Sequence, residues 1–351
     1  MTAVLEHAFI ERLAAGLPRA RAQLNRLHES DAELVRLPGD AGVLAVTTDG
    51  LAEEIATGLY ADPELIGWML VTINASDLAA VGAEPLGILV CETLPPDVTP
   101  EWLAALNGGI RAACEATGLG VLGGDTNAGA AIHLVGTALG LITQGRPLTR
   151  RGARPRDRLY ASGPLGLGGA YALGRLASGG NGQSVPYRPQ ARLREGRLLR
   201  AFASACMDTS DGAIATVDEL ARRNGIGFRL DEPVERWTHT AALAAATAAG
   251  LPPWMLHAGP HGEFELVFTV PADREAAFLS AARTAAWDPV PLGRATAKPG
   301  IKLLIDAELR SLDTGRVRNL FAEVEGDVEK YVAGLYTLLS QQPDRTAAGQ
   351  V

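Results

Sequence analysis

The sequence predicts an α/β protein, in the α+β sense, that is built from two domains. From about residue 38 onward, short β-branched runs alternate with longer stretches of helical periodicity, which indicates mixed sheets covered by helices. With 351 residues the chain is long enough for two compact cores. A content of 47% hydrophobic and 21% charged residues is that of a globular protein.

The first part of the chain is predicted to form a helix, a strand and a second helix. Residues 1–37 have helical periodicity, and the apolar side chains of one face are expected to pack on the protein: Leu5, Phe9, Ile10, Leu13 and Leu17. A turn at residues 38–40 leads into a strand over residues 42–48, so Asp49 lies at a strand end. A helix over residues 62–83 carries Asp77 within an otherwise apolar surface.

The remaining elements continue this alternation. Strands are expected at residues 86–94, 118–123, 132–142, 158–162, 226–230 and 264–270. Helices are expected at residues 100–117, 189–205 and 213–223. The composition changes after Gly163, and glycines at 179–182 interrupt the chain. The predicted division is a helical extension at 1–37, domains at 38–160 and 161–325, and a C-terminal helix and tail at 326–351.

Composition and charge exclude several classes of protein. A formal charge of -8 disfavours nucleic acid as a partner, because binding to a duplex requires many Lys and Arg side chains, so a small-molecule substrate is expected. Acidic residues near the N-terminus and the lack of a long apolar segment predict neither a signal peptide nor a membrane span. A cytoplasmic location is therefore expected.

Cysteine and lysine usage excludes two kinds of site. The three cysteines lie too far apart for a zinc motif, and buried packing is expected for each: Cys91, Cys114 and Cys206. All lysines come late in the chain, so no lysine is available for a P-loop before Lys298. The phosphates of a bound nucleotide must then be held by metal, arginine and backbone N–H groups.

Six aspartates share one context, beside Gly, Ser or Thr at the edge of an apolar run: Asp40, Asp49, Asp77, Asp125, Asp208 and Asp211. Taken singly, each of these aspartates is better explained as a residue that caps a helix start than as a catalytic or metal-binding residue. Together they suggest a shared pocket, where two carboxylates about 4 Å apart repel by roughly 4 kcal/mol at an effective dielectric near 20. A divalent cation reverses this repulsion, and an all-oxygen ligand set favours Mg²⁺ together with nucleotide phosphate.

Residues 163–169 form a glycine-rich stretch between an expected strand and a helix. Its N–H groups could cradle a phosphate, and a plain tight turn is an equal alternative. The proline at 164 and the lack of an acidic residue at the expected distance disfavour a dinucleotide fingerprint.

Several motifs follow one another in a fixed order: Gly39-Asp40, Thr48-Asp49-Gly50-Leu51, Asn74-Ala75-Ser76-Asp77-Leu78, Gly123-Gly124-Asp125-Thr126, Leu148-Thr149-Arg150-Arg151-Gly152 and Asp208-Thr209-Ser210-Asp211-Gly212. This order resembles the thiamine-monophosphate kinases, within the superfamily of aminoimidazole ribonucleotide (AIR) synthase. Hydrogenase maturation dehydratase and selenophosphate synthetase, two other members, are disfavoured because no cysteine follows Cys206 or precedes Cys91.

The resemblance implies a two-domain AIR synthase-like fold, in which the N-terminal mixed sheet forms a homodimer interface and ATP binds nearby. It implies magnesium ligands at Asp40, Asp49, Asp77, Asp125 and Asp211. Asp125, Asp211 and Arg150 are the implied catalytic residues. Nucleotide contacts are implied at Thr48, Gly123, Gly124, Thr126, Arg150, Ser210 and Gly212. Substrate contacts are assigned to Asp208, His261 and Glu263.

The chain departs from the kinase pattern at several positions. Ala41 stands where a second aspartate is usual, and Ala56, Met69 and Ala128 replace a histidine, a lysine and an arginine. The usual Gly-Glu-Asp triplet reads His261-Gly262-Glu263. These changes leave the identity of the acceptor open.

The expected reaction is direct in-line transfer of the γ-phosphoryl group of ATP, with Mg²⁺, to an oxygen of thiamine monophosphate. A diverged ligase or cyclase that activates an amide or carbonyl oxygen is the alternative, and a non-catalytic nucleotide-binding protein is a third. Candidates for phosphate contact are Arg150, Arg151 and Arg192. A role as solvated surface residues is an equally favoured alternative for each of them. His133 is expected to be a core histidine.

Overall fold

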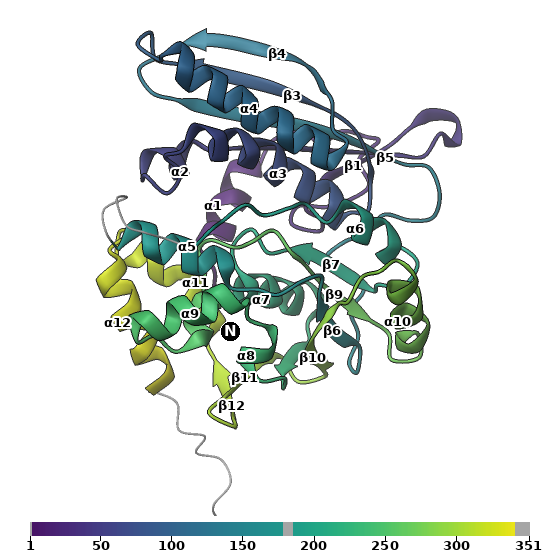
Figure 1. The fold of residues 1–351 in the computed structure, drawn as a ribbon. Helices are drawn as coiled ribbons and strands as arrows, with labels where there is room; N and C mark the ends of the chain where they lie inside the picture. Colours follow the sequence, from purple (N-terminus) through teal and green to yellow (C-terminus); the bar gives the residue numbers. More distant parts are fainter. Residues whose placement is uncertain (1, 178–184, 341–351) are drawn as a thin grey trace, which may run out of the picture.

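The computed structural model describes residues 2–177 and 185–340 and places them in two sheets with their covering helices (Figure 1). The first sheet has the strand order β1-β2-β5-β3-β4, with bounds β1 Glu33–Arg36, β2 Val43–Gly50, β3 Glu84–Leu94, β4 Val121–Ala128 and β5 His133–Ile142. Within this sheet β3 and β4 pair in parallel, whereas the other neighbours are antiparallel. The predicted two-domain α/β fold is confirmed.

Two long helices, α3 (Pro63–Ala80) and α4 (Pro100–Thr117), cover one face of this sheet. Asp62 starts α3 by accepting a hydrogen bond from the backbone N–H of Glu64 at 3.1 Å. The two helices pack closely through small residues, because a Cβ on Gly67 would lie 2.1 Å from the carbonyl oxygen of Leu106. Since α3 is buried on nearly every side, it forms the centre of the molecule between the sheet and the second domain.

The opposite face of the first sheet is exposed and apolar. Its large exposed side chains belong to three neighbouring strands: Leu86, Leu89, Leu122 and Val135. All eight residues of the edge strand β4 are exposed. His133, expected in the core, is also exposed on β5, and Cys91 is exposed on β3. Both expectations were wrong because these residues point to the face of the sheet that no helix covers.

The second sheet has the order β12-β11-β8-β10-β6-β9-β7, in which only β8 and β11 pair in parallel. Its strands are β6 Arg158–Ala161, β7 Ala205–Asp208, β8 Gly227–Leu230, β9 Leu266–Val270, β10 Val290–Thr296, β11 Gly300–Ile305 and β12 Glu308–Leu312. The helices and 3-10 turns of this domain are α5 Leu167–Leu176, α6 Leu193–Leu199, α7 Ala213–Asn224, α8 Val234–Trp237, α9 Thr240–Ala249, η2 Pro253–His257, α10 Glu275–Thr284, α11 Thr314–Glu323 and α12 Val328–Ser340.

The N-terminal region differs from the prediction. Within residues 1–37 the structure forms one helix, α1 (Leu5–Ala14), followed by loops and β1. The helix lies on the second domain, where the amide of Asn319 donates to the carbonyl of Ala3 at 2.8 Å. Its apolar residues Leu5, Phe9 and Leu13 are more than half exposed. The prediction that this face packs on the protein is therefore wrong for a single chain. Polar contacts, rather than the apolar stripe, hold the helix in place.

The boundary between the domains also comes earlier than expected. β6 already pairs with β9 and β10 of the second sheet, so the second domain includes residues that the prediction gave to the first. The glycines at 179–182 lie outside the described residues. None of the helices in the described part of the chain has the length and apolar character needed to cross a bilayer.

Candidate active site between the two domains

Three carboxylates from separate parts of the chain meet where the domains join. Asp31 precedes β1, Asp77 lies in the last turn of α3, and Asp208 ends β7. One oxygen from each lies within 4.8 Å of the others. Ser76 donates to Asp208 at 2.5 Å, and the Thr47 hydroxyl donates to Asp77, so hydroxyl groups orient both carboxylates. The predicted convergence of distant aspartates is therefore present for Asp77 and Asp208.

The electrostatics of this cluster favour a cation. Burial raises the pKa of Asp208 to about 7, with a further contribution from the charge of Asp31. Burial also raises the pKa of Asp77 well above its usual range, helped by the charges of Asp49 and Asp208. The Oδ2 atom of Asp31 is buried and has no hydrogen-bond partner among the described residues. An all-oxygen set with an unpartnered buried oxygen fits a hard divalent cation such as Mg²⁺.

Asp31 was missed by the sequence analysis, which assigned its role to Asp40. Asp40 lies in the short 3-10 turn η1 (Pro38–Asp40), between β1 and β2. The strand from Val43 to Asp49 separates this turn from the cluster by about 20 Å at roughly 3.3 Å per residue. A signal for Asp31 was present, because Ser30-Asp31 precedes a strand and repeats the Ser-Asp pair of Ser76-Asp77. The motif that begins at Gly39 pointed to Asp40, whose turn lies outside the cluster of Asp31, Asp77 and Asp208.

Asp49 and Asp211 lie near this cluster. The backbone N–H of Asp49 donates to the amide oxygen of Asn74 on α3 at 3.2 Å. The pKa of Asp49 is raised by loss of hydration and by the charge of Asp31, although the residue as a whole is exposed. Burial raises the pKa of Asp211 to about 6, with contributions from Glu6 and Asp49. Four of the six predicted aspartates, with Asp31 added, therefore share one electrostatic environment.

Asp125 is not brought to the cluster within one chain. In the ladder, Asp49 is in register with Gly136, Val90 and Gly124, so Asp125 on the next position of β4 points to the opposite face. It lies on the exposed face of the sheet, where Asn127 donates to it at 2.8 Å. Gly123, Gly124 and Thr126 are also exposed on this edge strand. Thr48 is exposed too, and its hydroxyl donates to the carbonyl of Gly136 at 3.0 Å.

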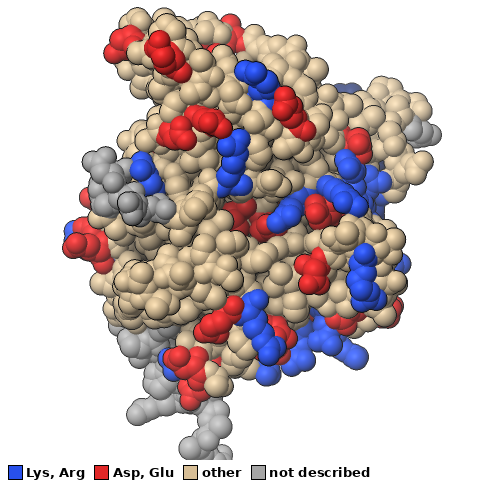
Figure 2. Space-filling view, in the orientation of Figure 1, with Lys and Arg blue, Asp and Glu red and all other residues tan. Residues whose placement is uncertain are grey.

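Of the three candidate arginines, only Arg150 reaches the site. Its guanidinium pairs with Asp31 at 2.9 Å, and its Nε atom is buried without a hydrogen-bond partner among the described residues. Arg151 pairs with Glu29 at 2.8 Å, away from the cluster, and Arg192 makes a two-point ion pair with Glu265. Figure 2, drawn in the same orientation as Figure 1, shows acidic and basic side chains alternating along the band where the two domains meet.

The turn after β7 holds Ser210, Asp211 and Gly212 at the start of α7. Gly212 adopts a φ of 84°, a conformation that favours glycine, and the turn packs tightly on residues 259–262. The N–H of Gly262 donates to the carbonyl of Ser210 at 2.9 Å. A Cβ on Gly262 would lie 1.5 Å from the carbonyl oxygen of Thr209, so only glycine fits.

Glu263 has a structural role that the sequence did not predict. Its carboxylate is buried and accepts hydrogen bonds from the N–H groups of Gly166 at 2.7 Å and Gly168 at 3.2 Å. The glycine-rich stretch is therefore held by the chain's own carboxylate at the start of α5, and of the two alternatives the tight turn is correct. The contact between Glu263 and substrate stays a prediction.

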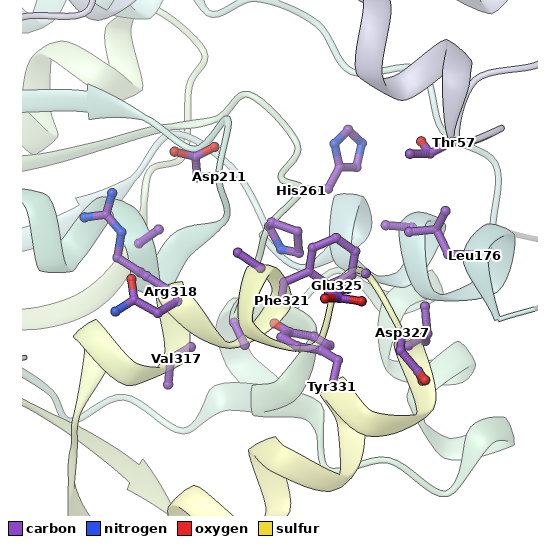
Figure 3. Close-up of a pocket in the computed structure, with 18 of the residues that line it drawn as sticks. Thr57, Leu176, Asp211, His261, Val317, Arg318, Phe321, Glu325, Asp327 and Tyr331 are labelled. Carbon is purple, nitrogen blue, oxygen red and sulfur yellow. The ribbon is translucent and has the colours of Figure 1, made fainter. Parts of the chain in front are cut away.

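A cavity of about 1010 Å³ opens beside Asp211 (Figure 3). It is lined by α2 (Ala52–Ala56), α5, residues 258–261, α11 and α12, together with Val4, Leu5 and Glu6. Carboxylates predominate over cations among its polar side chains: Glu6, Glu53, Glu54, Asp211, Glu325, Asp327 and Glu329, against Arg318. Arg318 is already paired with Asp218 and Glu219, both at 3.2 Å.

His261 lines this cavity as expected of a substrate residue. Its ring approaches the hydroxyl of Tyr60 at 3.2 Å and lies among the rings of Tyr171, Tyr187 and Phe264. Burial lowers the pKa of His261 to about 4, so its imidazole is neutral at pH 7. Of the altered family positions, Met69 is fully buried in α3, whereas Ala56 is exposed at the end of α2.

The two domains match two family models. Residues 29–142 match the N-terminal domain of AIR synthase related proteins, and residues 154–306 match their C-terminal domain. The chain belongs to the AIR synthase related family. The first match begins beside Asp31.

Among the members of this family, the chain is thiamine-monophosphate kinase-like. It is 34% identical to the thiamine-monophosphate kinase of Methanospirillum hungatei over 254 residues, which cover 70% of this chain and 80% of that protein. The crystal structure of thiamine-monophosphate kinase from Stenotrophomonas maltophilia is 27% identical, with a TM-score of 0.64 over 88% of this chain and 98% of the other. A structure described as AaThiL complexed with AMPPCP and TMP shares the fold at 23% identity and a TM-score of 0.69, over 89% of this chain and 99% of the other.

Proposed function

We propose that this protein transfers the γ-phosphoryl group of ATP to thiamine monophosphate, giving thiamine diphosphate. The observation that carries the proposal is the cluster of Asp31, Asp77 and Asp208, which lies near a large cavity with Asp211 at its edge. The kinases to which the chain is similar, at up to 34% identity, support this choice of reaction.

Asp31, Asp77 and Asp208, with Asp49 and Asp211 beside them, are the residues that would hold magnesium. Bound there, magnesium supplies charge neutralisation for the phosphoryl group during transfer. Arg150 holds the carboxylate of Asp31 in place through its ion pair at 2.9 Å. The hydroxyls of Thr47 and Ser76 fix the orientation of two of these carboxylates, so the site is ordered before nucleotide arrives.

The cavity beside Asp211 is proposed as the acceptor site. Its volume is at the upper end of the usual range for small-molecule pockets, about 300–1,000 Å³. The excess of carboxylates and the rings of Phe321, Tyr331 and His261 suit an aromatic cation such as the thiazolium group of thiamine. Because the acceptor oxygen belongs to a phosphate that is already ionised, these residues need only position it, and no general base is required.

We also propose that the protein is a cytoplasmic homodimer formed through the exposed face of the first sheet. This face carries four exposed large apolar residues and the unpaired edge of β4, a combination that would make a lone chain prone to aggregation. Asp125 and Thr48 lie on the same face, so a second copy packed there would bring its Asp125 toward the nucleotide site. One chain alone leaves Asp125 far from the other carboxylates.

The test is ADP release by the purified protein with ATP, Mg²⁺ and thiamine monophosphate, with the organic product identified by mass. Thiamine diphosphate formation that requires Mg²⁺ supports the proposal. Acceptor-dependent ADP release with a different organic product would instead identify a ligase or cyclase of this family. Mg²⁺-dependent ATP binding without ADP release, over a broad set of metabolites, would show a non-catalytic nucleotide-binding protein.

A further inference from the structure

One wall of the cavity lies outside the segments shared with the family. Residues of α11 and α12 between Val317 and Tyr331 form this wall, whereas the family models match residues 29–142 and 154–306. Figure 3 shows Phe321, Glu325 and Tyr331 on this side of the cavity, with Asp211 and His261 across from them. The α11–α12 hairpin therefore lies outside the residues that the two family models match, and it closes the proposed acceptor site.

The added helix α12 is firmly packed. Tyr331, Leu335 and Leu338 are buried and belong to the core of the second domain. The ring of Tyr331 meets that of Phe321 edge-on, with centroids 5.4 Å apart and planes at 89°. Gly334 permits close contact with α11, because a Cβ there would lie 2.9 Å from Leu320.

The hydroxyl of Tyr331 links this helix to the aspartate turn. It donates to the carbonyl oxygen of Gly259 at 2.6 Å. Gly259 in turn packs against Asp211, because a Cβ on Gly259 would lie 2.4 Å from the carbonyl oxygen of Asp211. Residues 259–262 are thus held between α12 on one side and the turn at residues 209–212 on the other.

We propose that Tyr331 is a positioning residue for Asp211. By fixing Gly259 against the aspartate turn, its hydroxyl keeps the Asp211 carboxylate aimed at the site between the domains. The proposal rests on the proposed function in one respect, namely that Asp211 takes part in magnesium binding. It goes beyond that function because the turn that carries Asp211 would be positioned by α12, a helix outside the residues that the family models match.

The experiment compares Tyr331→Phe with Tyr336→Phe, which is a matched control. Tyr336 lies on the same helix and its hydroxyl also contacts a glycine carbonyl, that of Gly250 at 3.2 Å, but it is exposed and does not line the cavity. Binding of the ATP analogue AMPPCP is measured by calorimetry over a range of Mg²⁺ concentrations. Loss of one hydrogen bond to the positioning segment should raise the Mg²⁺ concentration for half-maximal binding about threefold to tenfold in Tyr331→Phe. Tyr336→Phe should leave it unchanged.

Two results would overturn the inference. One is a Tyr331→Phe protein whose melting temperature falls while its Mg²⁺ dependence stays that of the unaltered chain, because the hydroxyl would then serve only stability. The other is a further change in Mg²⁺ dependence when Tyr331→Phe is added to Asp211→Asn, because Tyr331 would then act elsewhere. AMPPCP binding needs no acceptor. The Mg²⁺ dependence of this binding therefore tests the role of Tyr331 even if the protein does not phosphorylate thiamine monophosphate.

Discussion

At the scale of single residues, the site is a place where stability has been given up for metal binding. The oxygens of Asp31, Asp77 and Asp208 lie within 4.8 Å of one another. Two full charges at that distance repel by about 3 kcal/mol at an effective dielectric near 20. The raised pKa values of Asp77 and Asp208 show that, without a cation, the cluster lowers this repulsion by holding protons.

Asp77→Asn should therefore stabilise the metal-free protein while abolishing its activity. The amide keeps the shape of the carboxylate and can still accept from Thr47, but it cannot ionise, so the repulsion that raises the pKa of Asp77 no longer opposes folding. We expect the free energy of unfolding without Mg²⁺ to rise by about 1 kcal/mol, and turnover to fall at least about 100-fold. Thermal unfolding with and without Mg²⁺, together with ADP release, measures both effects.

Asp40→Asn is the control for this variant, because η1 lies at the far end of β2 from Asp49. It should change neither the melting temperature nor turnover by much. A strong loss of turnover in Asp40→Asn, with Asp77→Asn still active, would contradict the placement of the site. It would favour the assignment made from the sequence.

The confusion between Asp31 and Asp40 shows what the sequence can and cannot decide at this scale. Both aspartates precede alanine and flank a short strand, so residue type and neighbours do not separate them. What separates them is the β1–β2 hairpin, which turns Asp31 toward α3 and leaves Asp40 in the connection. Asp49 and Asp77 could be predicted because each lies near the end of an element whose periodicity is clear, whereas Asp208 could be predicted only from its motif with Thr209, Ser210, Asp211 and Gly212.

At the scale of elements, α5 shows how a helix start can resemble a ligand site. The N–H groups of Gly166 and Gly168 point to Glu263, which comes from a segment almost 100 residues later in the chain. Burial raises the pKa of this carboxyl to about 7. A glycine-rich stretch before a helix therefore indicates that its N–H groups bind an anionic group. The sequence does not reveal that this group is a carboxylate of the protein itself.

Glu263→Ala should lower stability more than it affects nucleotide binding. Alanine leaves the N–H groups of Gly166 and Gly168 buried without their acceptor. We expect the free energy of unfolding at pH 6, where the carboxyl is largely protonated and no charge is lost, to fall by about 1–3 kcal/mol in urea denaturation. Glu308→Ala, at an exposed position of β12, should leave it nearly unchanged. A stable Glu263→Ala protein that has lost acceptor binding would instead show that Glu263 contacts the substrate.

Elements with a strong apolar period were predicted well, and those defined by tertiary pairing were not. The helix expected at residues 62–83 corresponds to α3, and that at residues 100–117 matches α4 in both bounds. By contrast, β1 and β7 have four residues each and form because a neighbouring strand offers hydrogen bonds. Nothing in so short a run distinguishes it from a loop before the partner strand is known.

At the scale of the whole molecule, the buried carboxyls set the pH dependence of stability in the absence of metal. Asp208 and Glu263 have pKa values of about 7 in the folded protein, against about 4 when exposed. Between these values the folded state holds protons that the unfolded state lacks, so unfolding releases protons and rising pH favours unfolding. Stability without Mg²⁺ should fall from pH 6.5 to pH 8.

Below pH 6.5 this trend should be offset. Burial lowers the pKa of His261 to about 4 and that of His257 to about 3, so the unfolded state binds protons there that the folded state refuses. Melting temperatures from pH 5 to 8 should therefore level off below about pH 6.5, near the usual pKa of histidine. Mg²⁺ should flatten the upper part of the curve by replacing the carboxyl protons. A melting temperature that rises steadily up to pH 8 without metal would contradict the assignment of these buried groups.

The arrangement of two copies decides whether Asp125 belongs to the site. In one chain it lies on the opposite face of the sheet from Asp49, with β5 and β3 between their strands. If the exposed faces of two first sheets pack together, each site takes Asp125 from the partner copy. Asp125→Asn and Asp77→Asn should then each be inactive as pure proteins and should complement each other when mixed.

In a dimer with shared sites, a mixed pair places both substitutions in one site and leaves the other intact. Random reassociation makes about half of the dimers mixed, so about one quarter of the unaltered activity should return. Sites formed within one copy would leave one defect in every site of the mixed pair, and no activity would return. Exchange of subunits is verified by native mass spectrometry, and Leu122→Lys, which places a charge on the apolar face, should prevent both dimer formation and complementation because the buried lysine would lack a partner.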